Sequence, residues 1–368
     1  MDVMNKFLPW ANPKLFTLEK KLILKAIKSN WISGGLYIDK FEKKISQYLN
    51  IKYGYLTSNG TSAIHLAFLA CNLKHGDEII VPGFGYLAAA NIANLMGLKI
   101  KFADVDKNTF CMNIETLKKQ ITKKTKAVVT INTYGNLHNL KELSFFLKKK
   151  KIIFIEDAAE SFGSKIRNKQ SGTFGDIGTF SFHATKNITT GEGGLIITDN
   201  KKIAENIKLY RSHGVKNKRY YHIVSGHNFR MTNFQAAMGY AQLSKINYII
   251  KKRKQLYAKY LTEIKKLKTN IYIQKIDNDC NFVPWTFAIK IDNKFKFSRD
   301  KIITKLLKQN IETRNGFYSP NNLKIFKKDN KLKNSDSLSK EIICLPLHLN
   351  MQTKDISQIF IKIRKFLK

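Results

Sequence analysis

The sequence predicts an α/β fold, with a large domain built on a mainly parallel central sheet and a smaller C-terminal α+β domain. Between residues 53 and 198 apolar strands alternate with amphipathic helices, which is the pattern of a sheet covered by helices on both faces. A chain of 368 residues with 43% hydrophobic residues exceeds one average domain and supports a large core. We therefore expect a large domain over residues 1–250 and a small domain over residues 251–368.

The individual elements follow from the spacing of apolar residues along the chain. Helical spacing over 17–29 and 38–49 flanks the turn Trp31-Ile32-Ser33-Gly34-Gly35. Strands are predicted at 53–57, 78–81, 101–105, 127–132, 152–157, 177–182 and 195–198. Helices are predicted at 63–71, 87–95, 113–120, 140–149, 201–210 and 233–243. Residues 212–230 predict an irregular loop, and a basic helix over 249–267 crosses to the small domain. That domain is expected to hold strands within 282–291 and helices at 300–309 and 353–367.

The formal charge of +38 comes mainly from lysines, which occur in every segment and greatly outnumber the arginines. Proteins that read nucleic acids depend heavily on Arg, whose planar fork matches phosphate and guanine. We therefore favour a solvated surface that reflects the composition of the source genome, and we expect no nucleic-acid partner. Attraction of an anionic substrate stays open as an alternative use of the charge.

The cysteines and histidines do not indicate disulfide or metal chemistry. The four cysteines are isolated, without a CxxC pair, and the eight histidines lack metal-ligand spacing. The first residues lack the apolar run of a signal peptide, and no apolar window is long enough for a membrane span. These patterns predict a cytoplasmic protein with reduced thiols, no metal and no membrane partner.

The turn Ser58-Asn59-Gly60-Thr61-Ser62 lies between a predicted strand and a predicted helix. The free N–H groups at the start of such a helix, together with its dipole, favour a bound anion such as phosphate. A plain N-cap, which any Ser, Thr or Asn provides, explains the turn equally well.

Two further strand ends carry charged residues. The apolar strand 152–157 ends at Asp157, which taken alone could simply cap the next helix. Lys186 follows the strand 177–182 and precedes the glycine-rich turn 191–194, a position suited to reaching a ligand rather than to packing. A Schiff-base lysine, an aspartate paired with a pyridinium nitrogen and an anchored phosphate are what pyridoxal phosphate requires. Tyr86, at another strand end, is placed to stack on the ring.

Taken together, the motifs resemble the DegT/DnrJ/EryC1/StrS family of sugar aminotransferases, which have the aspartate-aminotransferase (type I) fold. The resemblance covers essentially the whole chain. It rests on residues 31–35, 58–61, 134–135, 156–160, 180–194, 228–232 and 345–348. Residues 219–221, 226–233 and 235–237 are most similar to the perosamine synthase branch, which aminates C4 of a GDP-linked 4-keto-6-deoxyhexose.

The resemblance implies a role for each matching residue. Lys186 forms the Schiff base and shuttles protons, and Asp157 pairs with the pyridine nitrogen. The remaining cofactor contacts are Tyr86 on the ring, Gly60, Thr61 and Ser181 at the phosphate, and Glu160 near the ring hydroxyl. Asn228 matches a residue that reaches the phosphate from a partner subunit, which implies a homodimer with shared sites. The implied substrate-side residues are Trp31, Ser33, Gly34, His213, Arg230 and Arg314.

The implied reaction is a transamination in two halves. L-Glutamate leaves 2-oxoglutarate and pyridoxamine phosphate, which then aminates a nucleotide-linked keto sugar. Departures from the family pattern at Asn132, at residues 183–185 and after Arg314 lie near the sugar, so amination at C3 or of a UDP- or dTDP-linked sugar stays open. A dehydratase of the same fold is disfavoured because those relatives carry histidine in place of Lys186. A binding or regulatory protein of the same fold is the alternative without catalysis.

Overall fold

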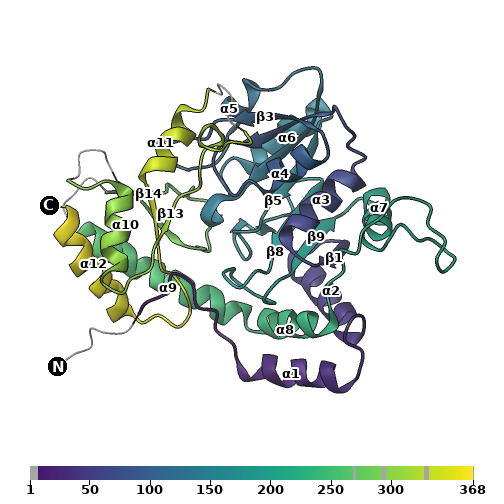
Figure 1. Cartoon of the computed structure of the whole chain (residues 1–368), viewed down its shortest axis with the longest axis horizontal. Helices are drawn as coiled ribbons and strands as arrows, with labels where there is room; N and C mark the ends of the chain where they lie inside the picture. The colour runs from purple at the N-terminus through teal and green to yellow at the C-terminus, as the bar shows by residue number, and fades with distance from the viewer. Residues whose placement is uncertain (1–6, 268–270, 292–295, 327–330, 368) are drawn as a thin grey trace.

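The computed structural model describes residues 7–267, 271–291, 296–326 and 331–367. Figure 1 shows a large α/β domain joined by the long helix α9 (Ile246–Lys265) to a smaller domain that contains the C-terminus. The central sheet has seven strands in the order β1-β9-β8-β5-β4-β2-β3. Strand β9 runs antiparallel to both of its neighbours, and the other strand pairs are parallel, which confirms the predicted α/β fold with a mainly parallel sheet.

The strands of the central sheet are β1 (Tyr53–Thr57), β2 (Glu78–Pro82), β3 (Lys99–Ala103), β4 (Thr125–Ile131), β5 (Ile153–Asp157), β8 (Ile177–Ser181) and β9 (Gly194–Thr198). The helices of the large domain are α1 (Thr17–Lys28), α2 (Leu36–Leu49), α3 (Gly60–Ala70), α4 (Ala88–Leu95), α5 (Ile114–Lys118), α6 (Leu140–Lys150), α7 (Lys201–Arg211) and α8 (Asn233–Ser244). A small three-stranded sheet, β11-β6-β7, joins Cys280–Asn281 to Lys165–Ile166 and Lys169–Gln170.

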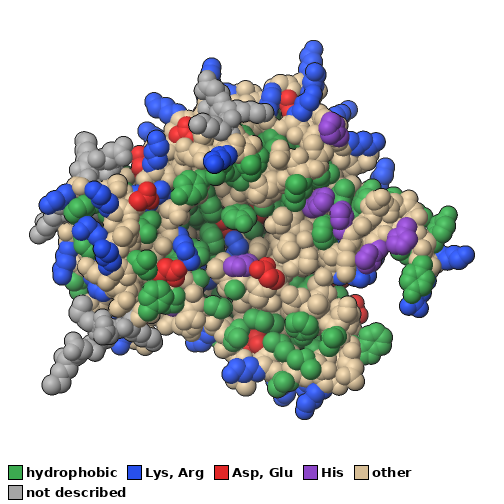
Figure 2. Space-filling view, in the orientation of Figure 1, with side chains coloured by type: hydrophobic (Ala, Val, Ile, Leu, Met, Phe, Trp, Pro, Cys, Tyr) green, Lys and Arg blue, Asp and Glu red, His purple; other side chains and the backbone are tan. Residues whose placement is uncertain are grey.

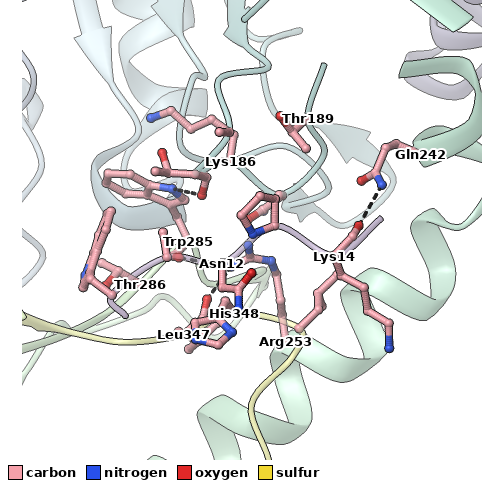
Figure 3. A pocket seen from close by; sticks show the side chains of 17 residues that line it. Asn12, Lys14, Lys186, Thr189, Gln242, Arg253, Trp285, Thr286, Leu347 and His348 are labelled. Carbon is pink, nitrogen blue, oxygen red and sulfur yellow. Dashed lines mark hydrogen bonds between the residues drawn. The ribbon is translucent and has the colours of Figure 1, made fainter. Parts of the chain in front are cut away.

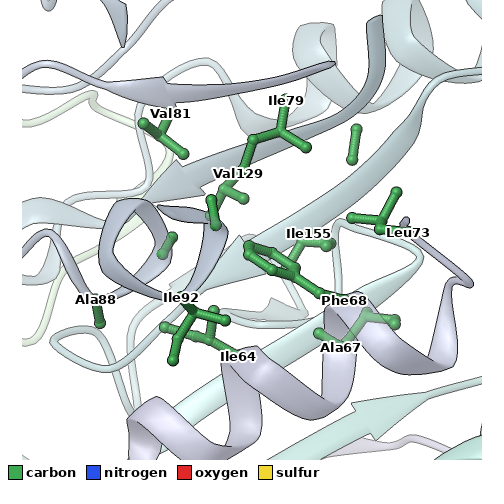
Figure 4. Packing of buried hydrophobic residues seen from close by; sticks show 14 of the residues in the cluster. Ile64, Ala67, Phe68, Leu73, Ile79, Val81, Ala88, Ile92, Val129 and Ile155 are labelled. Carbon is green, nitrogen blue, oxygen red and sulfur yellow. The ribbon is translucent and has the colours of Figure 1, made fainter. Parts of the chain in front are cut away.

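Alternate residues of the strands supply two hydrophobic layers, one on each face of the central sheet. Ile79 and Val81 pack with α3, α4 and α7, whereas Ile80 packs with α5 and α6. Figure 4 shows side chains of α3 and α4 packed against Val129 and Ile155 of the sheet. Since burying one such side chain contributes about 1.5–3 kcal/mol, this double layer makes the sheet a rigid support for its strand ends.

The small domain has its own sheet and core. Its strands have the order β10-β12-β14-β13, and all neighbours are antiparallel. The elements are β10 (Ile271–Ile273), β12 (Phe287–Ile291), α10 (Arg299–Leu307), β13 (Arg314–Asn315), α11 (Lys333–Glu341), β14 (Ile342–Leu345) and α12 (Thr353–Leu367). Helix α9 contributes Ile246 and Ile249 to a large-domain core and Leu256 and Tyr260 to the small-domain core. We retain the division at residue 250 as a proposal.

Several predicted elements differ from the structure. Helix α3 begins at Gly60 rather than at residue 63, and α9 begins at Ile246 rather than at 249. The range 282–291, predicted as strand, contains only β12, because Pro284 lacks the N–H that a ladder needs. Helix α11 was not predicted, since its sequence is almost wholly polar and buries only two serines and Leu338.

The first described residues pack on the small domain, although the sequence places them with the large one. Leu8 pairs with Ile311, and the Trp10 N–H donates to the carboxylate of Glu312 at 2.9 Å. The chain then crosses to α1 on the large domain (Figure 1). The N-terminal segment therefore joins the two domains next to the site described below.

Candidate active site

Lys186, Asp157 and Glu160 come together at the carboxyl edge of the central sheet. Asp157 is the last residue of β5, which pairs with β8, and Lys186 lies in the turn after β8. Lys186 Nζ is 4.0 Å from Glu160 Oε1, and the two side chains are 13% and 3% exposed. Parallel strands point their carboxyl ends to one edge, and ligands of open α/β sheets bind there. The structure therefore brings these side chains together at one edge of the sheet, and their role in a site stays a prediction.

Burial dominates the electrostatics of this group. Desolvation raises the pKa of Asp157 to about 6, against the opposing effects of the Ala159 N–H and Lys186. Desolvation likewise raises the pKa of Glu160 to about 7, although Lys186 and the Tyr134 N–H oppose the rise. For Lys186 burial lowers the pKa, and Glu160 and Asp157 oppose that shift. Three ionisable groups thus have pKa values shifted toward neutrality, as expected where protons are transferred.

The carboxyl group of Asp157 is buried and accepts one hydrogen bond. It is 4% exposed, and its Oδ1 accepts a hydrogen bond from the Ala159 N–H at 3.0 Å. A buried carboxylate is costly unless it is paired, so a protonated ring nitrogen beside Asp157 would restore its charge. Such an acceptor fits the pyridinium N–H of pyridoxal phosphate.

The start of α3, here called the anion corner after its predicted role, lies next to β8. Asn59 caps the helix, since its Oδ1 accepts from the Ser62 N–H at 2.8 Å. Among the hydrogen bonds of the described residues, none uses the N–H of Gly60 or Thr61, so both donors remain available at the helix end. A Cβ on Gly60 would lie 2.9 Å from Cβ of Ser181. The N-cap interpretation of this turn is therefore confirmed, and the phosphate site stays a prediction that the free donors allow.

Tyr86 follows β2 and is 64% exposed. Its ring makes an edge contact with Phe317 of the small domain, at 6.4 Å between ring centroids. Phe317 in turn stacks on Tyr134 at 5.4 Å. A large aromatic ring with so much free surface is suited to packing on a planar ligand.

Asn228 lies in the segment between α7 and α8, which projects from the right side of the molecule in Figure 1. It is exposed and bridges to Ser212, and the neighbouring Phe229 carbonyl accepts the Ser58 N–H at 2.9 Å. The segment is thus attached to the turn that precedes α3. Whether Asn228 serves a partner subunit remains a prediction.

The six implied substrate-side residues lie outside this buried group. Trp31, Ser33 and Gly34 form the exposed turn between α1 and α2. Asn233 holds this turn, because its amide Nδ2 donates to the Trp31 carbonyl at 2.7 Å. Among the described residues, no hydrogen bond, ion pair or ring contact joins any of the six to Lys186, Asp157 or Glu160.

Of the other three substrate-side residues, two contact each other and the third pairs with Glu312. Nη2 of Arg230 lies 3.2 Å from Nε2 of His213. Arg314 forms an ion pair with Glu312 at 2.6 Å, on the small domain. All of these side chains are exposed, so their roles toward a sugar remain proposals. Figure 2 shows a recess near the centre of this face where hydrophobic, basic, acidic and histidine side chains meet.

Trp285 was missed by the sequence reasoning. Its ring centroid is 4.0 Å from Lys186 Nζ, and its Nε1–H donates to the Thr185 carbonyl at 2.9 Å. Trp285 comes from the small domain, far along the chain from Lys186, and nothing in its local pattern signals a site. The one sequence signal is the Pro284-Trp285 pair, which comes just before the strand β12.

A cavity of about 20 Å³, enough for one water molecule, lies behind the Lys186 turn. Figure 3 shows Trp285, Arg253, His348 and the N-terminal segment around it. Asp157, Gly60 and Tyr86 do not line this cavity, so it backs the lysine rather than forming the anion corner.

Two kinds of site are absent from the part of the chain that the structure describes. No group of three or more His, Cys, Asp or Glu side chains there could hold a metal ion. No helix among those residues is long and apolar enough to cross a membrane.

A mainly parallel sheet, a helix start with free backbone donors, and a buried lysine facing two buried carboxyls at the carboxyl edge are the features of the type I class of pyridoxal-phosphate enzymes. Within that class, the chain belongs to the DegT/DnrJ/EryC1/StrS aminotransferase family, whose model matches residues 14–364. The predicted family, fold and cofactor class are therefore confirmed.

Relatives with assigned functions indicate which branch of the family this chain resembles. A GDP-perosamine synthase from Vibrio cholerae is 36% identical over 321 residues, which cover 87% of each chain. A GDP-perosamine synthase from Escherichia coli O157:H7 is 34% identical and covers 98% of this chain and 99% of the relative. The prediction of a nucleotide-sugar aminotransferase similar to the perosamine synthase branch is thus supported along the whole chain.

Solved structures show the same fold. The aminotransferase TlmJ from Streptoalloteichus hindustanus superposes with a TM-score of 0.92 at 20% identity, over 98% of this chain and 99% of that one. The E. coli GDP-4-keto-6-deoxy-D-mannose-3-dehydratase with bound hydrated pyridoxal phosphate has a TM-score of 0.89 at 28% identity, over 99% and 100% of the two chains. A mutant of GDP-4-keto-6-deoxymannose-3-dehydratase with bound GDP-perosamine matches with a TM-score of 0.87 at 28% identity, over 99% and 100%.

Proposed function

We propose that this aminotransferase moves the amino group of L-glutamate to the C4 ketone of a GDP-linked 4-keto-6-deoxy sugar, giving a GDP-perosamine-like amino sugar for a surface polysaccharide. The observation that carries the proposal is the buried group of Lys186, Asp157 and Glu160 beside the anion corner of α3. The sugar is inferred from the relatives named GDP-perosamine synthase, which are 32% to 36% identical to this chain.

The residues of the site would contact different groups of pyridoxal phosphate. Asp157 would pair with the ring nitrogen, Glu160 would approach the ring hydroxyl, and Tyr86 would pack on the ring face. Gly60, Thr61 and Ser181 would hold the phosphate at the start of α3. Once bound there, pyridoxal phosphate supplies an electron sink and, as pyridoxamine phosphate, carries the amino group from donor to acceptor.

The protein's own groups handle the protons. Burial lowers the pKa of Lys186, which increases the neutral fraction of its amine and makes it a better nucleophile and base. Glu160, with a pKa raised to about 7, can release or take up a proton 4.0 Å from Lys186 Nζ. Lys186 is therefore positioned to move a proton between the reacting carbon atoms.

The substrate also suits the charge of the chain. A nucleotide sugar carries a diphosphate, and a protein with a formal charge of +38 attracts such anions over long range. Arg230, His213 and Arg314 are the exposed groups that we propose contact the nucleotide sugar, together with Trp31, Ser33 and Gly34.

We also propose that the enzyme is a homodimer that works in the cytoplasm. Trp31, Ile32 and Leu36 are 70%, 52% and 59% exposed, an apolar surface that a second copy would cover. The projecting segment that carries Asn228 would then contribute to the neighbouring site. The four cysteines are free thiols, as is usual in a reducing compartment.

Spectroscopy of the purified protein tests the cofactor half of this proposal. We expect a yellow protein whose absorbance near the border of the visible and ultraviolet is bleached by L-glutamate, with release of 2-oxoglutarate. A colourless protein that gains no colour with added pyridoxal phosphate would contradict the proposal.

A further inference from the structure

Trp285 makes two separate contacts with the lysine turn. The face of its ring lies 4.0 Å from Lys186 Nζ, measured to the ring centroid. Its Nε1–H donates a hydrogen bond of 2.9 Å to the carbonyl of Thr185, which is the peptide group immediately before Lys186. Figure 3 shows the indole between the Lys186 turn and the segment that contains His348. One side chain of the small domain thus contacts both ends of the catalytic lysine, its backbone and its amine.

We propose that Trp285 is a positioning residue that holds the free amine of Lys186 in a fixed place whenever this amine is not bonded to the cofactor. The inference rests on the proposed function, because it concerns the lysine that the reaction repeatedly releases and recovers. The ring face attracts the protonated amine, and the indole N–H fixes the peptide from which the side chain extends.

The indole itself is held rigidly. Nη1 of the buried Arg253 donates to the backbone carbonyls of Pro284, Trp285 and Leu347, at 3.2, 3.1 and 3.2 Å. Trp10 packs its edge against the indole at 5.4 Å, and Tyr134 stacks on it at 6.2 Å. A side chain fixed through its backbone, its edge and its face can define the position of a flexible lysine.

The charged groups around Lys186 make such a fixed place useful. Glu160 lies 4.0 Å from Nζ, and Asp157 is the other charged group whose field acts on this amine. Both carboxyls lie toward the sheet edge, whereas Trp285 contacts the amine from the small domain. The ring of Trp285 therefore favours the protonated amine of Lys186 and adds no further negative charge to the site. It also keeps Nζ close to Glu160.

The test measures the titration of Lys186 in the full-length enzyme after removal of the cofactor. The rate of acetylation of Lys186 by acetic anhydride is followed by peptide mass spectrometry between pH 6 and pH 11. Three variants are compared with the wild type: Trp285→Leu, Trp285→Phe and Phe297→Leu. Phe297→Leu is the matched control, because it removes a ring face that lies 4.4 Å from the amine of another lysine, Lys305, and no ring contact joins Phe297 to Trp285 or Lys186 among the described residues.

We expect the apparent pKa of Lys186 to fall by about 1 unit in Trp285→Leu, which loses the ring face. In Trp285→Phe the face remains, so the pKa stays within about 0.5 unit, while kcat falls roughly tenfold through loss of the hydrogen bond to Thr185. Phe297→Leu should match the wild type in both measurements.

A Lys186 pKa in Trp285→Leu equal to that of the wild type would overturn the proposal even if kcat fell, since a purely structural role lowers activity without moving this pKa. Circular dichroism of each variant tests whether it is folded. Because the titration uses neither cofactor nor sugar, it can fail while the proposed transamination stands, and it can succeed if another substrate proves correct.

Discussion

At the residue scale, burial rather than any unusual side chain gives Lys186, Asp157 and Glu160 their chemistry. All three carry ordinary groups whose pKa values move toward neutrality because water is excluded from them. Lys186 and Asp157 were predictable, because Asp157 ends one recognisable strand, Lys186 lies in the turn after another, and parallel strands share an edge. Trp285 was not, since its contact with Lys186 depends on how the small domain packs against the large one, which no local pattern encodes.

Removal of the lysine amine should abolish turnover without unfolding the protein. We expect kcat of Lys186→Ala to fall by roughly 10⁴-fold or more, because neither the nucleophile nor the proton carrier remains. The measurement is 2-oxoglutarate released per enzyme. Lys202→Ala, which removes an exposed lysine of α7, serves as the control and should keep wild-type activity.

Asp157→Asn should make the cofactor-free protein more stable and the enzyme inactive. The folded-state pKa of Asp157 is raised, from 3.8 to about 6, so the native state binds the extra proton between those values. Ionisation therefore costs stability as the pH rises from about 4 to about 6, and the full cost persists above pH 6.

Chemical denaturation at several pH values checks this prediction. At pH 8 we expect Asp157→Asn to unfold with a free energy about 1–3 kcal/mol higher than the wild type, and at pH 4 the two should be equal. A variant less stable than the wild type at pH 8 would show that Asp157 is stabilised when ionised.

At the scale of single elements, the start of α3 shows what the sequence can predict about a helix end and what it cannot. Asn59, Gly60 and Thr61 indicated a helix start and an anion site, but the pattern could not choose between a cap and a phosphate site. The structure shows that Asn59 accepts from the Ser62 N–H, while the N–H groups of Gly60 and Thr61 make no hydrogen bond among the described residues. Helix α11 escaped prediction because packing on the large domain, not apolar periodicity, stabilises it: Asp104 accepts from the Asn334 and Ser335 N–H groups.

A methyl group on Gly60 should close the anion corner. The Cβ of Gly60→Ala would lie 2.9 Å from Cβ of Ser181, so β8 and α3 must separate or the bound phosphate must shift. We expect the Kd for pyridoxal phosphate to rise roughly tenfold or more, the loss of about 1.4 kcal/mol or more.

Fluorescence titration with the cofactor measures this affinity. Activity should recover at high cofactor concentration, because Lys186 and Asp157 remain in place. Wild-type affinity in Gly60→Ala would place the phosphate elsewhere.

At the scale of the whole molecule, the two domains and the N-terminal segment enclose the lysine, while one apolar surface stays uncovered. The sequence predicted the two-domain α/β organisation because hydrophobic periodicity specifies each element. It could not show that residues 7–12 pack on the small domain or that Trp285 reaches the lysine turn, since both depend on contacts between distant segments.

The uncovered apolar surface predicts a dimer, and a charged residue introduced into this surface should weaken the association of the two copies. The wild type should sediment at twice the chain mass of 42.4 kDa. Leu36→Glu, in a position that is 59% exposed, should raise the dimer dissociation constant at least roughly tenfold, because a buried charge would lack a partner. Phe145→Glu, which changes an exposed residue of α6 on another part of the surface, should leave the dimer intact. Sedimentation of the wild type as a monomer would contradict the shared-site arrangement.

The central claim, transamination of a nucleotide-linked keto sugar, is tested most directly by a panel of GDP-, UDP- and dTDP-linked keto sugars. Each is incubated with the holoenzyme and L-glutamate, and the products are identified by mass spectrometry and NMR. The account predicts one 2-oxoglutarate per amino sugar formed, with the new amine at C4 of the GDP-linked 4-keto-6-deoxy sugar. A deoxygenated sugar without an added amine, or no 2-oxoglutarate with any member of the panel, would contradict it.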